Sequence, residues 1–380
     1  MVIVLILLGL AVLSAGLQIW QWRGASRFPL HERPPAKRGE PGITFLKPLK
    51  GADAETLACL ESWLTQKTSG ALQVIFGVAS MEDPVVPVVR GLLERHPAID
   101  AELVLCDEVL GANSKVSKLV QLARRAKHDV IVVSDADVFV PGDLTSQLLA
   151  KMQDPLVGLV NCFYRLANPT TTAMRWEAVA INADFWSQVL QSTALKPMDF
   201  ALGAVMAVRR DALTQIGGFE SLVNHLADDY QLGHRVSAKG YRIELSPVVV
   251  ECREYPQGWK QVWSHQLRWA RTIRACQPAP FFASILSNAS LWPLLAWAAS
   301  VRTSLSVVGL VVPLLVLRIS AAASMHRRLS PETFRWCDLW LVPVKDLLNA
   351  AIWLAAFTGS HVVWRGVKYR VMKGGELVRV

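Results

Sequence analysis

Two aspartates separated by one residue follow a run of β-forming residues in VIVVSDADVFVP, Val130–Pro141. At the end of a buried strand, Asp135 and Asp137 would make each other harder to ionise. A divalent cation removes this repulsion, because Mg²⁺ or Mn²⁺ takes oxygen ligands and keeps positions open for substrate phosphates. A pair of solvated turn residues is the alternative, and for this tripeptide alone it is the better explanation. Further features of the sequence favour the cation site over solvated turn residues.

Asp83 and Lys115 also lie at predicted element ends. Asp83, in MEDP, follows a strand and can bind a nucleotide's base or ribose, or it can cap the helix beginning at Pro84. Lys115, in GANSKVSKL, falls in the first turn of a helix that Asn113 or Ser114 can cap. A cation there opposes the helix dipole, and a bound anion would offset that cost. A solvated surface lysine is an equally good explanation.

Two adjacent aspartates, Asp228 and Asp229, open a predicted helix in LADDYQLGHRV. Acidic residues are favourable in a first helical turn whatever their function. A carboxylate within hydrogen-bond reach of a hydroxyl can also take its proton as a general base. The functional hypothesis is that one of the pair has this role.

The segment SHQLRWARTIR, Ser264–Arg274, places several polar residues on one helical face. His265, Arg268 and Trp269 share that face through the spacing i, i+3, i+4. Arg268 with Arg271 or Arg274 can clamp a diphosphate, which suits guanidinium geometry, and Trp269 can stack on a sugar. The alternative is a basic helix lying on anionic lipid.

The elements that must position these residues appear as apolar runs alternating with helical patterns. Strands that are apolar on both faces and alternate with helices predict an α/β fold with a doubly wound, mostly parallel sheet. Ligands of such sheets bind beyond the carboxyl ends of the strands, where Asp83, Asp135 and Asp137 fall. The predicted strands are 43–49, 72–80, 101–106 and 129–134, and the predicted helices are 54–66, 85–96 and 115–127.

The N-terminal segment Val2–Trp20 carries no charge and is long enough to span a bilayer. A cleaved signal peptide is the alternative, but there is no basic region before the segment. By the positive-inside rule, the basic residues that follow place the next domain in the cytoplasm. These residues are Arg23, Arg27, Arg33, Lys37 and Arg38.

The chain becomes apolar again after Cys276, although Pro293 and Arg302 interrupt it. The basic tail 359–380 favours a cytoplasmic end and therefore an even number of C-terminal spans. We expect two, near 303–320 and 339–357, with 281–299 lying in the interface as an amphipathic segment. The basic loop between these two spans argues against this arrangement.

Composition limits the partners. The formal net charge of +9 suggests an anionic partner, either lipid or a phosphate-bearing substrate, and we expect no nucleic acid partner. The six cysteines are widely separated and lack zinc-ligand spacing, so we interpret them as reduced core or incidental residues.

Taken in order, these motifs resemble the inverting GT-A glycosyltransferases. They are similar to the ceramide glucosyltransferase family and its bacterial relatives, including hopanoid-pathway glycosyltransferases. The resemblance extends from Ile43 to the C-terminus. It is also carried by FLKPLKG, NSKVSKL, LGAVMAVRR, IGGF, LADDYQLG and WRGVKYRV.

The resemblance implies roles for individual residues. Asp83 matches the aspartate that holds the nucleotide, Asp135 and Asp137 match the D-x-D that binds metal and diphosphate, and Asp229 matches the catalytic base. Arg268 and Trp269 match the end of the (Q/R)-x-x-R-W signature. His265 departs from its first position, which puts the acceptor in doubt rather than the reaction. Lys115, Asp228, His265 and Arg271 complete the expected substrate contacts.

The implied function is transfer of a hexose from a UDP-sugar to a lipid hydroxyl by a membrane protein whose catalytic domain faces the cytoplasm, at a bacterial inner membrane. The cofactor would be Mg²⁺ or Mn²⁺. Ceramide is the first expected acceptor, a hopanoid polyol the second and diacylglycerol the third. Glucose, N-acetylglucosamine and galactose remain open as donor sugars. The alternatives are a polyprenyl-phosphate sugar transferase, a processive polysaccharide synthase and a non-catalytic lipid-binding protein.

The expected organisation follows from these assignments. It comprises an N-terminal transmembrane helix (1–22), a linker (23–42), a GT-A catalytic domain (43–278), an interfacial segment (279–302), transmembrane helices (303–358) and a basic cytoplasmic tail (359–380).

Overall fold

The computed structural model describes residues 1–35, 39–301, 306–364 and 366–380. It forms two compact units, each described by itself. The sheet unit contains Pro29–Leu166, Pro197–Tyr255 and Gly375–Val380, and the helical unit contains Met1–Phe28, Ala167–Lys196 and Pro256–Gly374. Lys37, Arg38, Arg302 and Thr303, which the sequence predictions use, lie outside the described residues. The predicted domain boundaries remain predictions.

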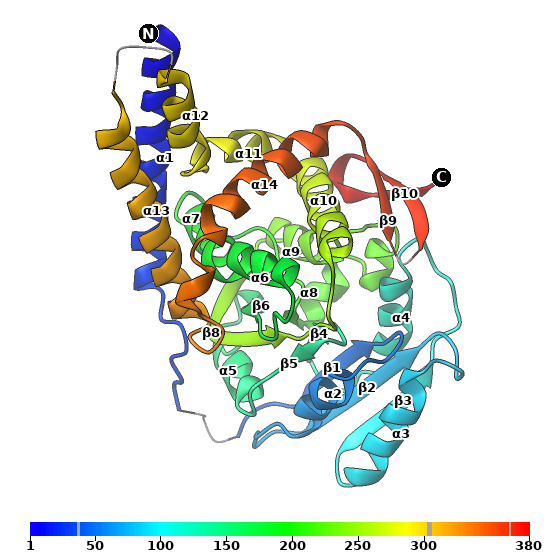
Figure 1. Cartoon of the computed structure of the whole chain (residues 1–380). Coiled ribbons are helices and arrows are strands. Elements are labelled where there is room, and N and C mark those ends of the chain that lie inside the picture. The colour runs from blue at the N-terminus through cyan, green and yellow to red at the C-terminus, as the bar shows by residue number, and fades with distance from the viewer. Residues whose placement is uncertain (36–38, 302–305, 365) are drawn as a thin grey trace. The chain divides into compact units, whose positions relative to one another are not determined.

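The sheet unit is built on an eight-stranded sheet of order β3-β2-β1-β4-β7-β6-β8-β5 (Figure 1). Among the described strands, β1 pairs in parallel with β2 and β4, and β2 with β3, whereas β7 is antiparallel to β4 and β6. The predicted α/β fold with a mostly parallel sheet is therefore confirmed. The strands are β1 Ile43–Pro48, β2 Leu72–Val78, β3 Asp100–Leu105, β4 Val130–Ser134, β5 Val138–Phe139, β6 Val157–Leu166, β7 Val205–Arg209 and β8 Arg242–Cys252, with β11 Leu377–Arg379 outside this sheet.

Helices cover both faces of this sheet. The chain moves outward from β1 to β3 and then returns past β1 to β4, so right-handed crossovers place α2 and α3 on one face and α4 on the other. The helices of this unit are α2 Thr56–Leu64, α3 Val85–Arg95, α4 Ser114–Ala123, α5 Leu144–Lys151, α8 Arg210–Gln215 and α9 Asp228–Ala238.

The predicted elements from Ile43 to Ser134 are confirmed, with one clear boundary correction. The helix predicted to reach Lys127 ends at Ala123. The next residues form tighter turns, and the backbone N–H of Lys127 donates to Gln73 of β2 at 2.9 Å. This side-chain acceptor on the sheet replaces the helical hydrogen bond, which sequence periodicity cannot reveal.

The helical unit contains most of the apolar helices. Three described helices are long and apolar enough to cross a membrane: α1 Val2–Arg27, α13 Val308–Leu329 and the stretch Trp336–Phe357. A further apolar pair, Pro278–Ser287 and Leu291–Ser300, is bent by 54°. The remaining bounds are α6 Thr172–Val179, the π-helix Ala180–Phe185, α7 Trp186–Thr193, α10 Trp259–Cys276, α11 Pro278–Ala283, α12 Leu291–Ser300, α14 Leu341–Phe357, β9 His361–Trp364 and β10 Val367–Val371.

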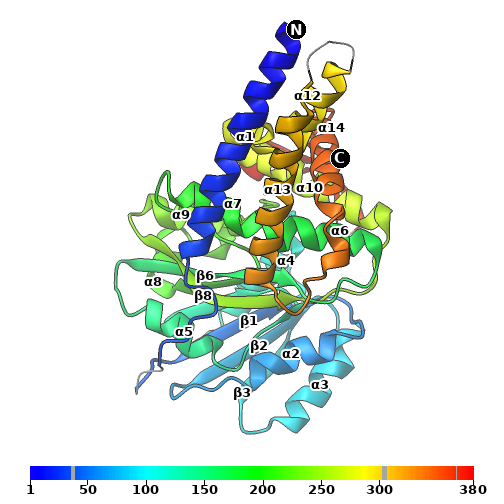
Figure 2. The ribbon, with the colours of Figure 1, turned by 60° about the vertical axis from the view of Figure 1, so that its left-hand side comes forward.

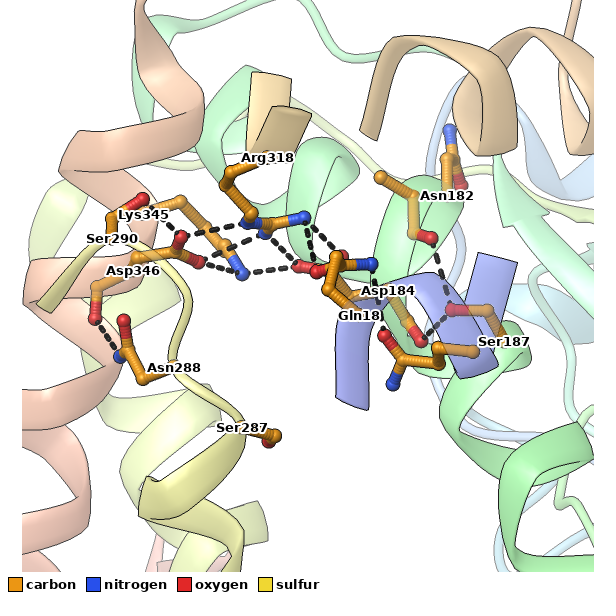
Figure 3. A network of polar contacts seen from close by, with 12 residues as sticks. Gln18, Asn182, Asp184, Ser187, Ser287, Asn288, Ser290, Arg318, Lys345 and Asp346 are labelled. Atoms are coloured by element: carbon orange, nitrogen blue, oxygen red, sulfur yellow. Dashed lines mark hydrogen bonds and ion pairs between the residues drawn. The ribbon is translucent and has the colours of Figure 1, made fainter. Parts of the chain in front are cut away.

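A buried ion cluster joins four segments of the helical unit (Figure 3). It consists of Asp184 from the π-helix, Arg318 from α13, and Lys345 and Asp346 from α14. Arg318 donates to both oxygens of Asp184 at 3.0 and 2.7 Å and to both oxygens of Asp346 at 2.8 and 2.9 Å. Lys345 contacts both carboxylates, and Gln18 of α1 accepts from Arg318 at 3.2 Å. Two cations and two anions therefore balance each other away from water.

Candidate functional site

The carboxyl edge of the parallel strands carries the predicted acidic residues. Asp83 follows β2, Asp135 and Asp137 follow β4, and β1 lies between these two strands. The Oδ1 of Asp83 accepts from the backbone N–H of Gly51, beyond β1, at 2.8 Å and from that of Val85 at 3.0 Å. Asp83 therefore caps the start of α3 and also joins two loops at this edge.

Lys47, at the end of β1, fixes the backbone beside the aspartate pair. Its side chain is 0% exposed, and its Nζ donates to Ser134 Oγ at 3.2 Å and to the carbonyl oxygen of Asp135. It also lies 4.3 Å from the ring centroid of Trp63. Burial lowers the pKa of Lys47 to about 7, although Asp135 and Asp137 oppose that shift. Lys47 thus holds Asp135 in place by binding the main-chain carbonyl oxygen of Asp135.

Lys115 brings the two acidic motifs together. Its Nζ lies 2.9 Å from Oδ1 of Asp135 and 3.2 Å from Oδ2 of Asp228. Burial alone would lower the pKa of Lys115, but these two carboxylates hold it well above its usual range. The side chain of Asn113 caps α4 by accepting from the backbone N–H groups of Lys115 and Val116. This cap fixes the backbone position of Lys115 in the first turn of α4. The unfavourable helix-dipole position of Lys115 is offset by its anionic partners.

Asp229 lies beside this cluster, in the first turn of α9. Burial raises its pKa to about 6, and Asp228 adds to the shift, whereas Lys115 opposes it. A Cβ added to Gly203 would come within 2.9 Å of Oδ2 of Asp229, so the backbone approaches the carboxylate closely. A carboxyl with a pKa near neutrality can take up and release a proton under working conditions.

Asp137 is the other carboxyl whose protonation is shifted. Burial raises its pKa to about 6, and the neighbouring Asp135 carboxylate raises it further, while Lys47 and Lys115 oppose the shift. The described residues contain no group of three or more His, Cys, Asp or Glu that could hold a metal ion. Two carboxylates do fit Mg²⁺ or Mn²⁺ when substrate phosphates and water supply the other ligands, as is common for these ions.

The R-W signature lies on α10 in the helical unit. His265 Nδ1 donates to Oε1 of Glu177 at 2.9 Å, and Gln266 donates to the same oxygen at 2.7 Å. Glu177 is 1% exposed, and its second oxygen has no hydrogen-bond partner among the described residues. The rings of His265 and Trp269 meet edge to face, with centroids 4.6 Å apart. Because an ionised carboxylate can only accept, Nδ1 of His265 carries the proton in this contact.

The two further arginines of α10 contact the backbone that follows α14. Arg271 donates to the carbonyl oxygen of His361, and Arg274 donates to that of Gly359 at 2.9 Å. Arg268, whose carbonyl oxygen accepts from Thr272 at 2.8 Å, lies one turn earlier on α10. The predicted clamp by Arg268 and Arg271 remains a prediction.

The structure thus joins Asp135, Lys115 and Asp228 directly and places Asp229 within their electrostatic influence. Asp83 and Asp137 lie at the same sheet edge, whereas His265, Arg268, Trp269 and Arg271 belong to the other unit. The amide of Asn113 also donates to Oδ1 of Asp228 at 3.5 Å. The sequence prediction gave no role to this contact, to Lys47 or to Glu177. Lys47 could have been noticed as the first lysine of FLKPLKG, at the end of a predicted strand. Nothing in the local pattern indicates a role for Glu177.

Comparison with known proteins supports the fold. A mannosyltransferase from Pyrobaculum calidifontis, solved with GDP-mannose and Mn²⁺, superposes with a TM-score of 0.54 at 20% identity and covers 91% of this chain and 99% of its own. This likeness identifies the fold as GT-A.

Sequence relatives extend over most of the chain. Ceramide glucosyltransferase 3 of Caenorhabditis elegans is 23% identical over 371 residues, which cover 93% of this chain and 78% of the relative. An N-acetylglucosaminyltransferase of Bradyrhizobium diazoefficiens is 25% identical over 313 residues, covering 78% and 59% respectively. The sequence model of glycosyl transferase family 21 matches residues 1–377 of this chain. The chain is therefore a member of glycosyl transferase family 21.

Proposed function

We propose that this protein is a membrane-bound inverting glycosyltransferase that moves a hexose from a UDP-sugar to a lipid hydroxyl. UDP-glucose and ceramide are the first-choice donor and acceptor. The observation that carries the proposal is the joining of Asp135 and Asp228 through Lys115, with Asp229 beside them, at the carboxyl edge of a GT-A sheet. Binding sites of open α/β sheets lie at this edge.

The donor is held mainly by its nucleotide and diphosphate. Asp83 binds the nucleotide, and Asp135 and Asp137 would hold the divalent cation. When bound, this cation neutralises charge on the departing diphosphate. Lys115 and Lys47 keep Asp135 in place through its side chain and its main chain respectively. Arg268 of the R-W signature donates to the leaving diphosphate, and Trp269 contacts the sugar or acceptor.

Asp229 acts as the general base. It removes the proton from the lipid hydroxyl, whose oxygen forms the new bond to the anomeric carbon while the bond to the UDP oxygen breaks. Attack opposite to the leaving group inverts the anomeric centre. A pKa of about 6 leaves Asp229 ionised at neutral pH while keeping it basic enough to accept the proton.

The apolar helices give the lipid acceptor a membrane setting. Arg23 and Arg27 follow the apolar part of α1, so by the positive-inside rule the sheet unit would face the cytoplasm. The proposed membrane is a bacterial inner membrane. UDP-N-acetylglucosamine with a hopanoid acceptor is the second candidate, favoured by the N-acetylglucosaminyltransferases among the relatives. A polyprenyl-phosphate acceptor would need little help from a base.

Replacement of the base tests the proposal. We expect Asp229→Asn to lower kcat for lipid glycosylation by about 10²–10⁴-fold, because the amide cannot take the proton. Binding of UDP with Mn²⁺, measured by calorimetry, should remain. Asp211→Asn is the matched control, since Asp211 also lies in a first helical turn, that of α8, but is exposed.

The outcomes separate the candidate functions. Near-native transfer by Asp229→Asn would remove Asp229 as the base, and activity on a phosphate acceptor would then favour the polyprenyl-phosphate reaction. Failure of the unaltered protein to bind UDP with Mn²⁺ would favour a non-catalytic lipid-binding protein. Mass spectrometry of lipids from an expressing host identifies the sugar and the acceptor.

A further inference from the structure

Helices α1 and α13 of the helical unit run side by side in the same direction (Figures 1 and 2). Near the start of both helices, Val4 packs with Val311 in one apolar cluster. Further along, Trp22 Nε1 donates to Ser324 Oγ at 3.0 Å. The end of α13 therefore lies at the same level as the basic C-terminal end of α1. Helix α13 thus brings the chain back to the side on which α1 ends.

Helix α12 forms the other arm of a hairpin with α13. Its last turn packs on the same apolar cluster through Ala299, beside Val4. Just before its first residue, Ser290 Oγ donates to Asp346 of the ion cluster at 2.5 Å. α12 thus runs from the level of the ion cluster to the level of Val4, in the opposite direction to α13.

Helix α14 does not reach the apolar cluster of described residues around Val4, where α1, α12 and α13 meet. Its first turn, with Leu341 and Val342, belongs to an apolar cluster with Trp176 of α6. Near its last turn, Trp353 Nε1 donates to the carbonyl oxygen of Phe281 in α11 at 2.9 Å. Both ends of α14 therefore lie against α6, α10 and α11, and the apolar cluster around Val4 contains no described residue of α14.

The outer side of α14 is nevertheless apolar. Trp340, just before the helix, and Leu347 and Leu354 within it are spaced seven residues apart and are 58%, 43% and 62% exposed. This spacing places them on one face of the helix. Phe282 of neighbouring α11 is 63% exposed. A continuous apolar face of this kind in water would be unfavourable, whereas a membrane interface accommodates it.

We propose that α12 and α13 enter the bilayer beside α1 as a hairpin, and that α14 lies flat in the cytoplasmic interface with this face in the lipid. The end of α13 and the loop that follows it then stay cytoplasmic, which suits Arg327 and Arg328 in the last turn of α13 and Arg335 in the loop. The expected spans 303–320 and 339–357 would place this basic loop outside. Both arrangements keep the C-terminus inside, so the loop distinguishes them.

Natural Cys337 in this loop provides the test, because it is exposed and the other cysteines are buried or half-buried. The full-length protein is treated with a membrane-impermeant maleimide in intact spheroplasts and in inside-out vesicles. We expect Cys337 to react only in the vesicles and Val2→Cys, in a Cys337→Ser background, only in the spheroplasts. Reaction of both from the same side would overturn the proposal. Glu332→Cys repeats the test, and a loop that reacts from neither side also contradicts it.

Depth measurements test the position of α14 independently. Nitroxide labels are attached to Trp340→Cys, Leu347→Cys and Leu354→Cys in the Cys337→Ser protein reconstituted into liposomes. A helix lying in the interface gives similar shallow depths for all three labels, by oxygen accessibility. A spanning helix would spread them over about 21 Å, at ~1.5 Å per residue. Such a gradient would overturn the proposal without affecting the proposed reaction.

Discussion

At the level of single residues, Asp229 and Asp137 share one property: burial and a neighbouring aspartate raise the pKa of each carboxyl to about 6. Each therefore loses its charge as the pH falls through about 6, although an ordinary aspartate would remain ionised there. The protonated Asp229 cannot act as a base, and the protonated Asp137 is a poor cation ligand.

The expected consequence is an acid limb in the pH profile. Below pH 6, log(kcat/KM) should fall with a slope between one and two, because both carboxyls must be ionised in the free enzyme. Rates measured from pH 5 to 8 at low donor concentration check this. A flat profile down to pH 5 would contradict the assignment of Asp229 as the base.

Glu177 is the residue through which His265 is positioned. Replacement of Glu177 by Gln keeps the shape but allows the amide to present either its oxygen or its NH₂ to Nδ1, so the imidazole tautomer is no longer fixed. If His265 contacts the substrate as proposed, we expect kcat to fall by about 10–100-fold with little change in KM, by analogy with partners that orient metal-binding histidines. Kinetics and thermal unfolding of the purified protein measure both effects.

A double-mutant cycle separates this positioning role from general packing. In a His265→Gln background, Glu177→Gln should cause little further loss of kcat, since there is no imidazole left to orient. Additive losses, or a large drop in thermal stability, would show that Glu177 acts only through the packing of α6 against α10.

At the level of elements, the position of α9 depends on a close backbone contact. A Cβ at Gly233 would come within 2.3 Å of the backbone nitrogen of Ala201 and 2.4 Å of the carbonyl carbon of Phe200. Neither backbone atom can move aside independently. This contact holds the helix whose first turn carries Asp228 and Asp229.

Gly233→Ala should therefore displace α9 and reduce transfer more than it reduces stability. Overpacking of this kind costs about 1–3 kcal/mol, and the shift also moves the proposed base. Gly91→Ala in α3 is the matched control, because nothing lies within 4 Å of its added Cβ. Transfer rates and thermal unfolding compare the two, and native activity of Gly233→Ala would disprove the argument.

At the level of the whole molecule, the ion cluster of Figure 3 connects residues far apart in the sequence, from Asp184 to Asp346. Arg318, which is 2% exposed, bonds both carboxylates. Removing one partner of a buried ion pair leaves an uncompensated charge, which is more costly than losing the contact alone.

Arg318→Met should destabilise the helical unit by about 3–5 kcal/mol, since Lys345 alone must then balance two carboxylates. Unfolding in detergent, followed by limited proteolysis, measures this. Arg327→Met on the exposed side of the same helix is the control, with little expected change. Asp184→Asn should partly restore the stability of Arg318→Met, and the absence of any restoration would contradict charge balance as the cause.

The sequence by itself determined the elements and the order of the motifs, because both depend on neighbours along the chain. Apolar runs predicted β1 to β4, and the acidic residues at strand and helix ends identified Asp83, Asp135, Asp137, Asp228 and Asp229. The helix containing His265 and Arg268 was likewise predicted from its spacing.

Only the tertiary structure decided which charges meet. The contacts of Lys115 with Asp228, of His265 with Glu177 and of Arg318 with Asp184 join residues about 90 or more positions apart, and no local period records such pairings. The same limit applies to α14, since its apolar composition suits a span or an interfacial helix equally. Its contacts with α6, α10 and α11 depend on how distant segments fold back, because hydropathy measures transfer from water and not the direction in which a helix runs.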